Sequence, residues 1–257
     1  MPHIQVDHLS ISFPLYHGSA RSLKKTAGRL LSGRLAEDRN HRIIVQAVRD
    51  VSFTIKPGDR VGLLGHNGAG KTTLLRALAG IYEPIQGNIR IQGTLSSLLE
   101  TTLGMNGELT GRENIRLRCL FNGFSAKRTA EIEENVQEFS ELDSYLDMPL
   151  RTYSSGMTLR LGFGLATAIN PQILMMDEWF MTGDAGFILK ATARLEKLIQ
   201  TAQILIISTH LPSVIATWCN RVFWMDQGYL KMQGTPQEIL PIYLGKDCSD
   251  LFASDKT

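Results

Sequence analysis

The sequence has 257 residues, with 27 Lys and Arg against 25 Asp and Glu, so its formal net charge is +2. Hydrophobic residues make up 43% and charged residues 20%, a balance that excludes a disordered, collagen-like or coiled-coil chain. The small net charge also argues against a protein that coats nucleic acid, because such proteins carry a large basic excess. We therefore expect a globular protein with no nucleic-acid partner.

The cysteines and the apolar runs indicate a compartment. Cys119, Cys219 and Cys248 lie far apart and form no C-x-x-C pair, which favours a reducing environment and disfavours a disulfide framework or a zinc site. The N-terminus has no apolar signal region, and no apolar stretch approaches the roughly 18 residues of a membrane span. We expect a cytoplasmic chain that works at a membrane only beside another protein.

In chain order, short apolar runs alternate with helical patterns, which predicts an α/β fold with a mostly parallel sheet covered on both faces. The segments around 43–55 and 87–93 instead alternate or resemble hairpins, which predicts an antiparallel β edge region. The apolar runs are Ile4–Val6, Val61–Leu64, Ile173–Met176, Ile204–Ile207 and Val222–Met225.

Two segments interrupt this plan of a single domain over residues 1–257. Residues 14–42 are rich in Arg and Lys and form a basic insertion. Residues 108–150 have a helical pattern, so we expect an inserted helical sub-domain over about residues 100–160.

A glycine-rich motif follows the apolar run Val61–Leu64 and precedes a helical pattern. It fits G-x-x-x-x-G-K-[ST], in which backbone N–H groups and a helix N-terminus surround phosphate oxygens. Lys71 is expected to reach the β- and γ-phosphates, and the Thr72 hydroxyl to bind Mg²⁺. The alternative is a simple glycine-rich turn before a helix. The predicted nucleotide-binding residues are Gly65, His66, Asn67, Gly68, Ala69, Gly70, Lys71, Thr72 and Thr73.

Further polar groups follow other predicted strands. The run Ile173–Met176 ends in two acids, which would place Asp177 near Mg²⁺ and Glu178 near the attacking water, although such a pair is more often a solvated loop. His210 follows the strand Ile204–Ile207, where contact with a γ-phosphate is geometrically reasonable.

A second anion site is predicted from serine hydroxyls and a glycine before a helical pattern, namely Ser154, Ser155, Gly156 and Met157. A simple helix N-cap is the alternative, and it is the favoured one when the motif is considered alone.

Taken together and in this order, the motifs resemble those of the ABC-transporter ATPases over about residues 3–245. The resemblance implies a P-loop NTPase core that hydrolyses ATP with Mg²⁺, with Lys71, Glu178 and His210 as its catalytic residues. Asp184 matches the D-loop aspartate of that family. The resemblance also implies a head-to-tail homodimer, in which Ser155 and Gly156 serve the nucleotide of the other subunit.

The resemblance leaves three positions open. The aromatic residue that stacks on adenine is best matched by Phe13, with Tyr16 as the alternative, while an aromatic core residue is an equally acceptable interpretation of Phe13. Glu100 stands where the family usually has the Q-loop glutamine and is a further candidate Mg²⁺ contact. Trp179 replaces a frequent proline, and we have no interpretation of it.

Three segments resemble the branch that exports O-antigen, capsule and teichoic acid: residues 109–114, 153–157 and 183–187. This branch implies a separate polytopic membrane permease and a lipid-linked polysaccharide, at the cytoplasmic face of the bacterial inner membrane. No C-terminal carbohydrate-binding domain is expected. The alternative is an ABC exporter of a lipid or drug. A soluble ABC ATPase of DNA repair or translation ranks lower, because those usually carry two ATPase units or a long coiled coil.

Within the insertion, residues 20–31 place apolar residues near one helical face and Arg21, Lys24 and Lys25 largely around the other. Such a helix suits a membrane surface or a lipid pyrophosphate. A surface helix docked on the core fits the pattern equally well.

Overall fold

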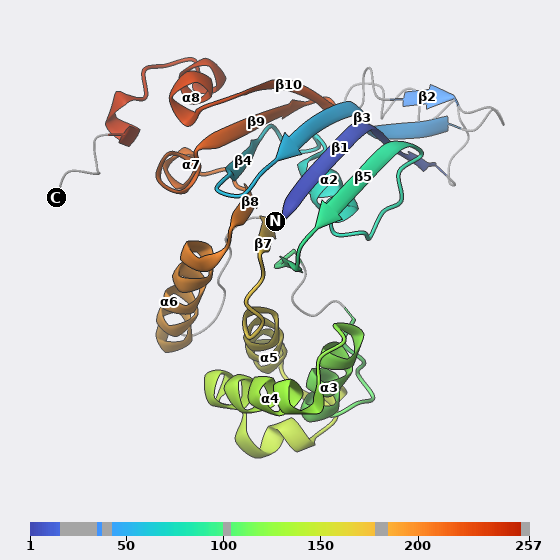
Figure 1. Ribbon diagram of the computed structural model, residues 1–257, viewed down its shortest axis with the longest axis vertical. Helices are drawn as coiled ribbons and strands as arrows, with labels where there is room; N and C mark the ends of the chain where they lie inside the picture. The colour runs from blue at the N-terminus through green and yellow to red at the C-terminus, as the bar shows by residue number, and fades with distance from the viewer. Residues whose placement is uncertain (16–34, 38–42, 100–103, 178–184, 253–257) are drawn as a thin grey trace. The chain divides into compact units, whose positions relative to one another are not determined.

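The structure, a computed structural model, describes residues 1–15, 35–37, 43–99, 104–177 and 185–252 (Figure 1). The chain forms two compact units. The core unit contains residues 1–94, 175–179 and 203–257, and the helical unit contains residues 95–174 and 180–202.

The first sheet of the core unit is antiparallel and has the strand order β2-β3-β1-β5. The buried side chains of β1 are Ile4 and Val6 and, after a register shift, Leu9 and Ile11, so this sheet has one buried face. Figure 1 shows β3, β1 and β5 side by side. The bounds are His3–Pro14 for β1, Leu35–Glu37 for β2, Ile43–Ile55 for β3 and Gln86–Gln92 for β5.

This sheet corrects one expectation from the sequence. Ile4–Val6 was expected among the strands of the parallel sheet, but β1 pairs antiparallel with both β3 and β5. The physical reason is that buried and less buried residues alternate on both sides of an irregularity between Val6 and Leu9, which suits a strand with one buried face.

The second sheet has the strand order β10-β9-β4-β8-β7-β6, and β4 pairs in parallel with β8 and β9. Strand β8 is buried at every position, as is typical of a central parallel strand covered on both faces. The strands are β4 (Arg60–Leu64), β6 (Leu95–Ser97), β7 (Ile173–Asp177), β8 (Ile204–Ser208), β9 (Arg221–Asp226) and β10 (Tyr229–Gly234). The helices of the core unit are α2 (Lys71–Leu78), α7 (Pro212–Trp218), α8 (Pro236–Leu244) and the 3₁₀ turn η4 (Ser249–Phe252).

The helical unit has its own apolar core, which includes the fully buried side chains of Ile115, Val136, Leu146 and Leu161. Thr110 begins α3 with a capping box, in which its hydroxyl accepts from the Glu113 N–H and the Glu113 carboxylate accepts from the Thr110 N–H. The elements are α3 (Gly111–Phe121), α4 (Ala126–Ser140), η2 (Asp143–Asp147), η3 (Leu150–Thr152), α5 (Ser155–Thr167) and α6 (Ala185–Thr201).

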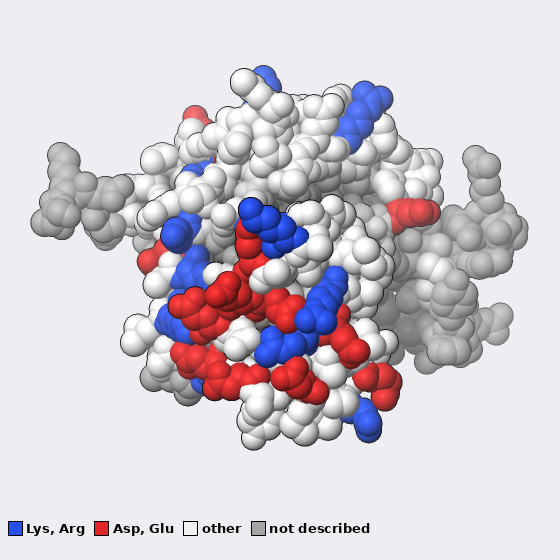
Figure 2. Space-filling view, turned by 60° about the horizontal axis from the view of Figure 1, so that its bottom comes forward, with Lys and Arg blue, Asp and Glu red and all other residues white. Residues whose placement is uncertain are grey.

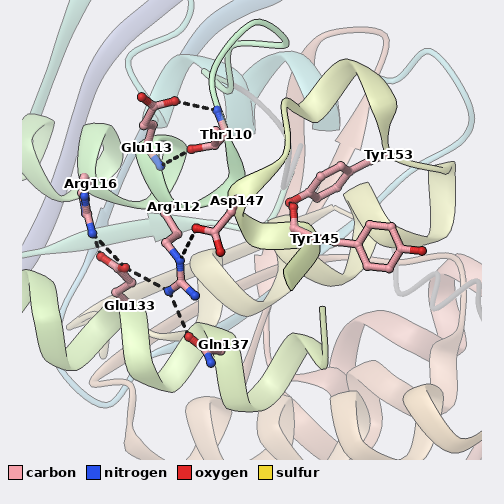
Figure 3. Close-up of polar contacts among 9 residues, drawn as sticks. All are labelled: Thr110, Arg112, Glu113, Arg116, Glu133, Gln137, Tyr145, Asp147 and Tyr153. Atoms are coloured by element: carbon pink, nitrogen blue, oxygen red, sulfur yellow. Dashed lines mark hydrogen bonds and ion pairs between the residues drawn. The ribbon is translucent and has the colours of Figure 1, made fainter. Parts of the chain in front are cut away.

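One arginine links three elements of the helical unit (Figure 3). The Arg112 guanidinium donates to Glu133 at 3.1 Å and to Gln137 at 2.9 Å on α4, and to Asp147 at 2.7 Å on η2. The carboxylates of Asp147 and Glu133 raise the pKa of Arg112 further above its ordinary value. Figure 2 shows acidic side chains gathered on one face of the molecule, with basic side chains between them.

Among the described residues, no helix has both the length and the apolar character needed to cross a bilayer. Cys119, Cys219 and Cys248 are buried free thiols. Burial raises the pKa of the Cys219 thiol to about 12, so this side chain stays uncharged at neutral pH.

Candidate functional site: a phosphate pocket in the core unit

The predicted phosphate loop connects the end of β4 to the start of α2. Steric and backbone constraints explain why glycine occupies two of its positions. Gly65 has φ +146°, and a Cβ atom there would lie 2.3 Å from the Met225 carbonyl oxygen. Gly70, the N-cap of α2, lies in the left-handed region with φ 106°. A side chain is therefore excluded at the first of these positions and disfavoured at the second.

Lys71 is the first residue of α2 and is only 7% exposed. Its Nζ atom donates to the Gly65 carbonyl at 2.6 Å and to the His66 carbonyl at 3.4 Å. The lysine therefore holds its charge against the inner side of its own loop, beside the N-terminus of α2, where an anion is favoured.

A cavity of about 200 Å³ lies over this loop, and the described residues that line it all belong to the core unit. The cavity brings Lys71 and Thr72 together with Asp177, the last residue of β7, and with His210, which follows β8. The lining residues are Ala47, Asn67, Gly68, Ala69, Gly70, Lys71, Thr72, Thr73, Asp177, Ser208 and His210.

The strand order explains why residues distant in the sequence meet here. Strand β8 lies between β4, which leads into the loop, and β7, which ends at Asp177. Ser208 at the end of β8 pairs with Leu63 of β4, so His210 follows at the level of the loop. Ligands bind at such carboxyl ends of parallel strands in open α/β sheets.

The donor set fits a magnesium nucleotide. Among the residues that the structure describes, the pocket offers one carboxylate, on Asp177, and the hydroxyls of Thr72 and Thr73, beside the buried ammonium of Lys71. Mg²⁺ beside a nucleotide commonly uses only one or two protein carboxylates, because phosphates and water supply the rest. No cluster of three or more His, Cys, Asp or Glu suited to a metal occurs in the described part of the chain.

Two lining residues were not foreseen from the sequence. Ala47 of β3 has no polar side chain that could have identified it. Ser208 ends the apolar run of β8, and its place at the pocket depends on the strand order, which no motif of the sequence reveals.

Two groups of aromatic contacts involve predicted nucleotide-binding residues, one at His66 and one at Phe13. The His66 ring of the loop contacts Tyr243 of α8, with ring centroids 5.9 Å apart, and Tyr243 meets Trp224 of β9 edge to face at 5.3 Å. Phe13 packs edge to face against Tyr82 at 5.1 Å. Phe13 is not among the residues that line the pocket, and its stacking on adenine stays a prediction.

The second predicted anion site lies in the helical unit, at the start of α5. The Ser154 hydroxyl accepts a hydrogen bond from the Met157 N–H at 3.2 Å, so this serine is the N-cap. Ser155 and Gly156 are exposed, whereas Met157 packs against the apolar core of the helical unit. The motif therefore presents a serine and a glycine at an open helix N-terminus, and its role toward a second nucleotide stays a prediction.

Several predicted site residues lie outside the described residues: Tyr16, Glu100, Glu178 and Asp184, together with Trp179 and most of the 14–42 insertion.

Comparison with known proteins identifies the family. The family model described as ABC transporter matches residues 48–181. The chain is 41% identical to the O-antigen export system ATP-binding protein RfbE of Yersinia enterocolitica, over 87% of this chain and 94% of that protein. It is 35% identical to the O-antigen export system ATP-binding protein RfbB of Klebsiella pneumoniae, over 94% of this chain and 97% of that protein. It is also 34% identical to the teichoic acids export ATP-binding protein TagH of Lactococcus lactis, over 93% of this chain but half of that longer protein.

Solved structures agree on the fold. An ATP-binding subunit of an ABC transporter superposes with a TM-score of 0.67 at 24% identity, over 97% of each chain. A dimeric ATP-binding cassette with ADP and Pi, in a post-hydrolysis state, superposes with a TM-score of 0.64 at 17% identity, over 91% of this chain and 98% of that one. With the glycine loop, the buried lysine and the family match in agreement, this chain belongs to the ABC transporter family as an ATP-binding ATPase subunit.

Proposed function

We propose that this chain supplies ATP hydrolysis to an exporter of lipid-linked polysaccharide, as a head-to-tail homodimer joined to a separate polytopic permease at the cytoplasmic face of the bacterial inner membrane. The observation that carries the proposal is the phosphate pocket, in a chain similar over most of its length to O-antigen export ATP-binding proteins. The similarity to a teichoic acid export protein points to the same class of cargo.

In this proposal each pocket residue has a role toward Mg²⁺–ATP. Lys71 neutralises charge on the β- and γ-phosphates from its buried position, and the loop N–H groups hold the phosphate oxygens. Thr72 and Asp177 would hold Mg²⁺. When bound, this ion would neutralise charge on the transferred phosphoryl group. His210 contacts the γ-phosphate.

Two further roles complete the cycle. Glu178 orients and activates the attacking water. The exposed Ser155 and Gly156 of α5 lie against the nucleotide of the second copy, which makes hydrolysis depend on dimerisation. Opening and closing of the dimer then drive the permease.

The test is deletion of the gene in its own host, followed by analysis of lipid-linked glycans on each side of the inner membrane. We expect finished polymer on its lipid carrier to accumulate inside, and export to return with the unchanged gene but not with Glu178→Gln. Glu196→Gln, an exposed carboxylate on α6, is the matched control and should restore export. Normal surface glycan without internal polymer would overturn the polysaccharide assignment and redirect the search to a lipid or drug.

A further inference from the structure

One polar side chain of the pocket, that of Ser208, is buried without a hydrogen bond to any described residue. Ser208 is 0% exposed, and its hydroxyl oxygen is buried without a hydrogen-bond partner among the residues that the structure describes. It is the last residue of β8 and lines the phosphate pocket beside Lys71 and Asp177.

Other buried hydroxyls of the chain are bonded to the backbone. Thr167 donates to the Phe163 carbonyl at 2.6 Å, and Ser140 donates to the Gln137 carbonyl at 3.5 Å. The Thr209 hydroxyl, directly after Ser208, accepts from the Leu211 N–H at 3.1 Å. Because burying an unpaired hydroxyl destabilises the folded state, the exception at Ser208 calls for a partner from outside the chain.

The position of Ser208 identifies the chemistry of that partner. Its strand lies between β4, which enters the phosphate loop, and β7, which ends at Asp177. A hydroxyl both donates and accepts, so it suits a phosphate oxygen and equally a water molecule bound to Mg²⁺.

We propose that the Ser208 hydroxyl is a nucleotide-binding group, which hydrogen-bonds an oxygen atom of the bound magnesium nucleotide. The inference rests on the proposal that this pocket holds the phosphates. It adds a residue that no motif of the sequence contains, and it explains why a polar side chain stands in an otherwise apolar, fully buried strand.

The two possible roles of Ser208 predict different behaviour for Ser208→Ala. A serine that only fills space would leave nucleotide affinity unchanged. A serine that bonds the ligand would lose affinity, while the ligand-free protein gains stability because the unpaired hydroxyl is gone.

The experiment measures thermal unfolding and the dissociation constant of Mg²⁺ with a non-hydrolysable ATP analogue, on the full chain. For Ser208→Ala we expect the midpoint of the ligand-free protein to rise by about 2 °C and the affinity to fall about 5- to 20-fold. Ser140→Ala is the matched control, since it removes a buried but bonded hydroxyl in the helical unit. This control should lower the midpoint and leave the affinity unchanged.

Repeating the titration with EDTA distinguishes the two oxygen sources. A loss of affinity that persists without Mg²⁺ identifies a phosphate oxygen, and a loss that disappears identifies a Mg²⁺-bound water. Equal affinity of Ser208→Ala and the unchanged chain would overturn the inference alone. Failure of the unchanged chain to bind the nucleotide would overturn the proposed function as well.

Discussion

The Nζ atom of Lys71 lies 2.6 Å from the carbonyl oxygen of Gly65, so the first residue of α2 is bonded to the first residue of the phosphate loop. Among the described residues that line the proposed phosphate site, this ammonium is the one Lys or Arg charge. Lys71→Ala should weaken binding of the magnesium nucleotide by about 100-fold, as expected for loss of a charged hydrogen bond. Calorimetric titration measures this change. Lys56→Ala, an exposed lysine of the core unit, is the control, and equal losses in both variants would contradict the role of Lys71.

The first glycine of the loop is expected to be intolerant of any side chain. In Gly65→Ala the new Cβ would lie 2.3 Å from the Met225 carbonyl oxygen, so the free energy of unfolding should fall by about 3 kcal/mol or more. Gly58→Ala is the control, because Gly58 also has positive φ (+90°) but no atom within 4 Å of the added carbon. Its cost should be only about 1–2 kcal/mol, from backbone strain. Urea unfolding that gave equal losses would argue against the clash.

Among the described residues, no close contact of Gly156 requires a glycine. A Cβ there would meet only the Ser154 hydroxyl, at 3.9 Å. Gly156→Ala should therefore raise the free energy of unfolding slightly, by about 0.5 kcal/mol, since alanine favours the helix. ATP hydrolysis by the assembled transporter should nevertheless fall at least about tenfold, because in the proposed dimer the added methyl group would face the second nucleotide.

A second glycine in α5 provides the contrast. At Gly164 the added carbon would lie 3.2 Å from Phe139 Cδ1, so Gly164→Ala should bring no gain in stability. Full ATPase activity of Gly156→Ala would remove Gly156 from the dimer interface.

The acid stability of the helical unit should depend on Glu133. Hydrogen bonds from Arg116, opposed by partial burial and reinforced by Arg112, hold the pKa of this carboxyl below its ordinary value of 4.5. A lowered folded-state pKa gives stability that is fully present above the unfolded value and is lost as pH falls through the folded one. Glu133→Gln should therefore cost about 1 kcal/mol at pH 7 and progressively less below pH 4.5.

The control for this prediction is Glu131→Gln on the same helix. Glu131 pairs with Arg128 at 2.9 Å and is 49% exposed, so its loss should change stability by less than about 0.5 kcal/mol. Chemical unfolding across pH 3–7 measures both variants. A constant difference between Glu133→Gln and the unchanged chain across that range would contradict the titration of Glu133.

The central strands could be predicted because their sequences are continuous apolar runs, which only a sheet covered on both faces accommodates. Strands β7 and β8 formed where such runs predicted them. Ile4–Val6 was too short to distinguish a parallel from an antiparallel strand. Its assignment depended on the pairing of Ile4 with Ile55 and Ile91, which are distant in the sequence.

The phosphate loop could be predicted because its chemistry lies in consecutive residues, where glycines and Lys71 act through local backbone geometry. Ser208 and Ala47 could not be recognised in that way, because their place depends on which strands are neighbours. The separate antiparallel sheet that brings Ala47 to the pocket was expected only as an edge region.

The ring contacts behind the loop give this protein an internal optical reporter. Trp224 touches Tyr243, and Tyr243 touches His66, so a rearrangement of the loop would alter the surroundings of an indole without any attached dye. The sequence contains only three tryptophans, so replacing Trp179 and Trp218 by phenylalanine would isolate this emission. Nucleotide binding and release could then be followed in real time on the otherwise native chain.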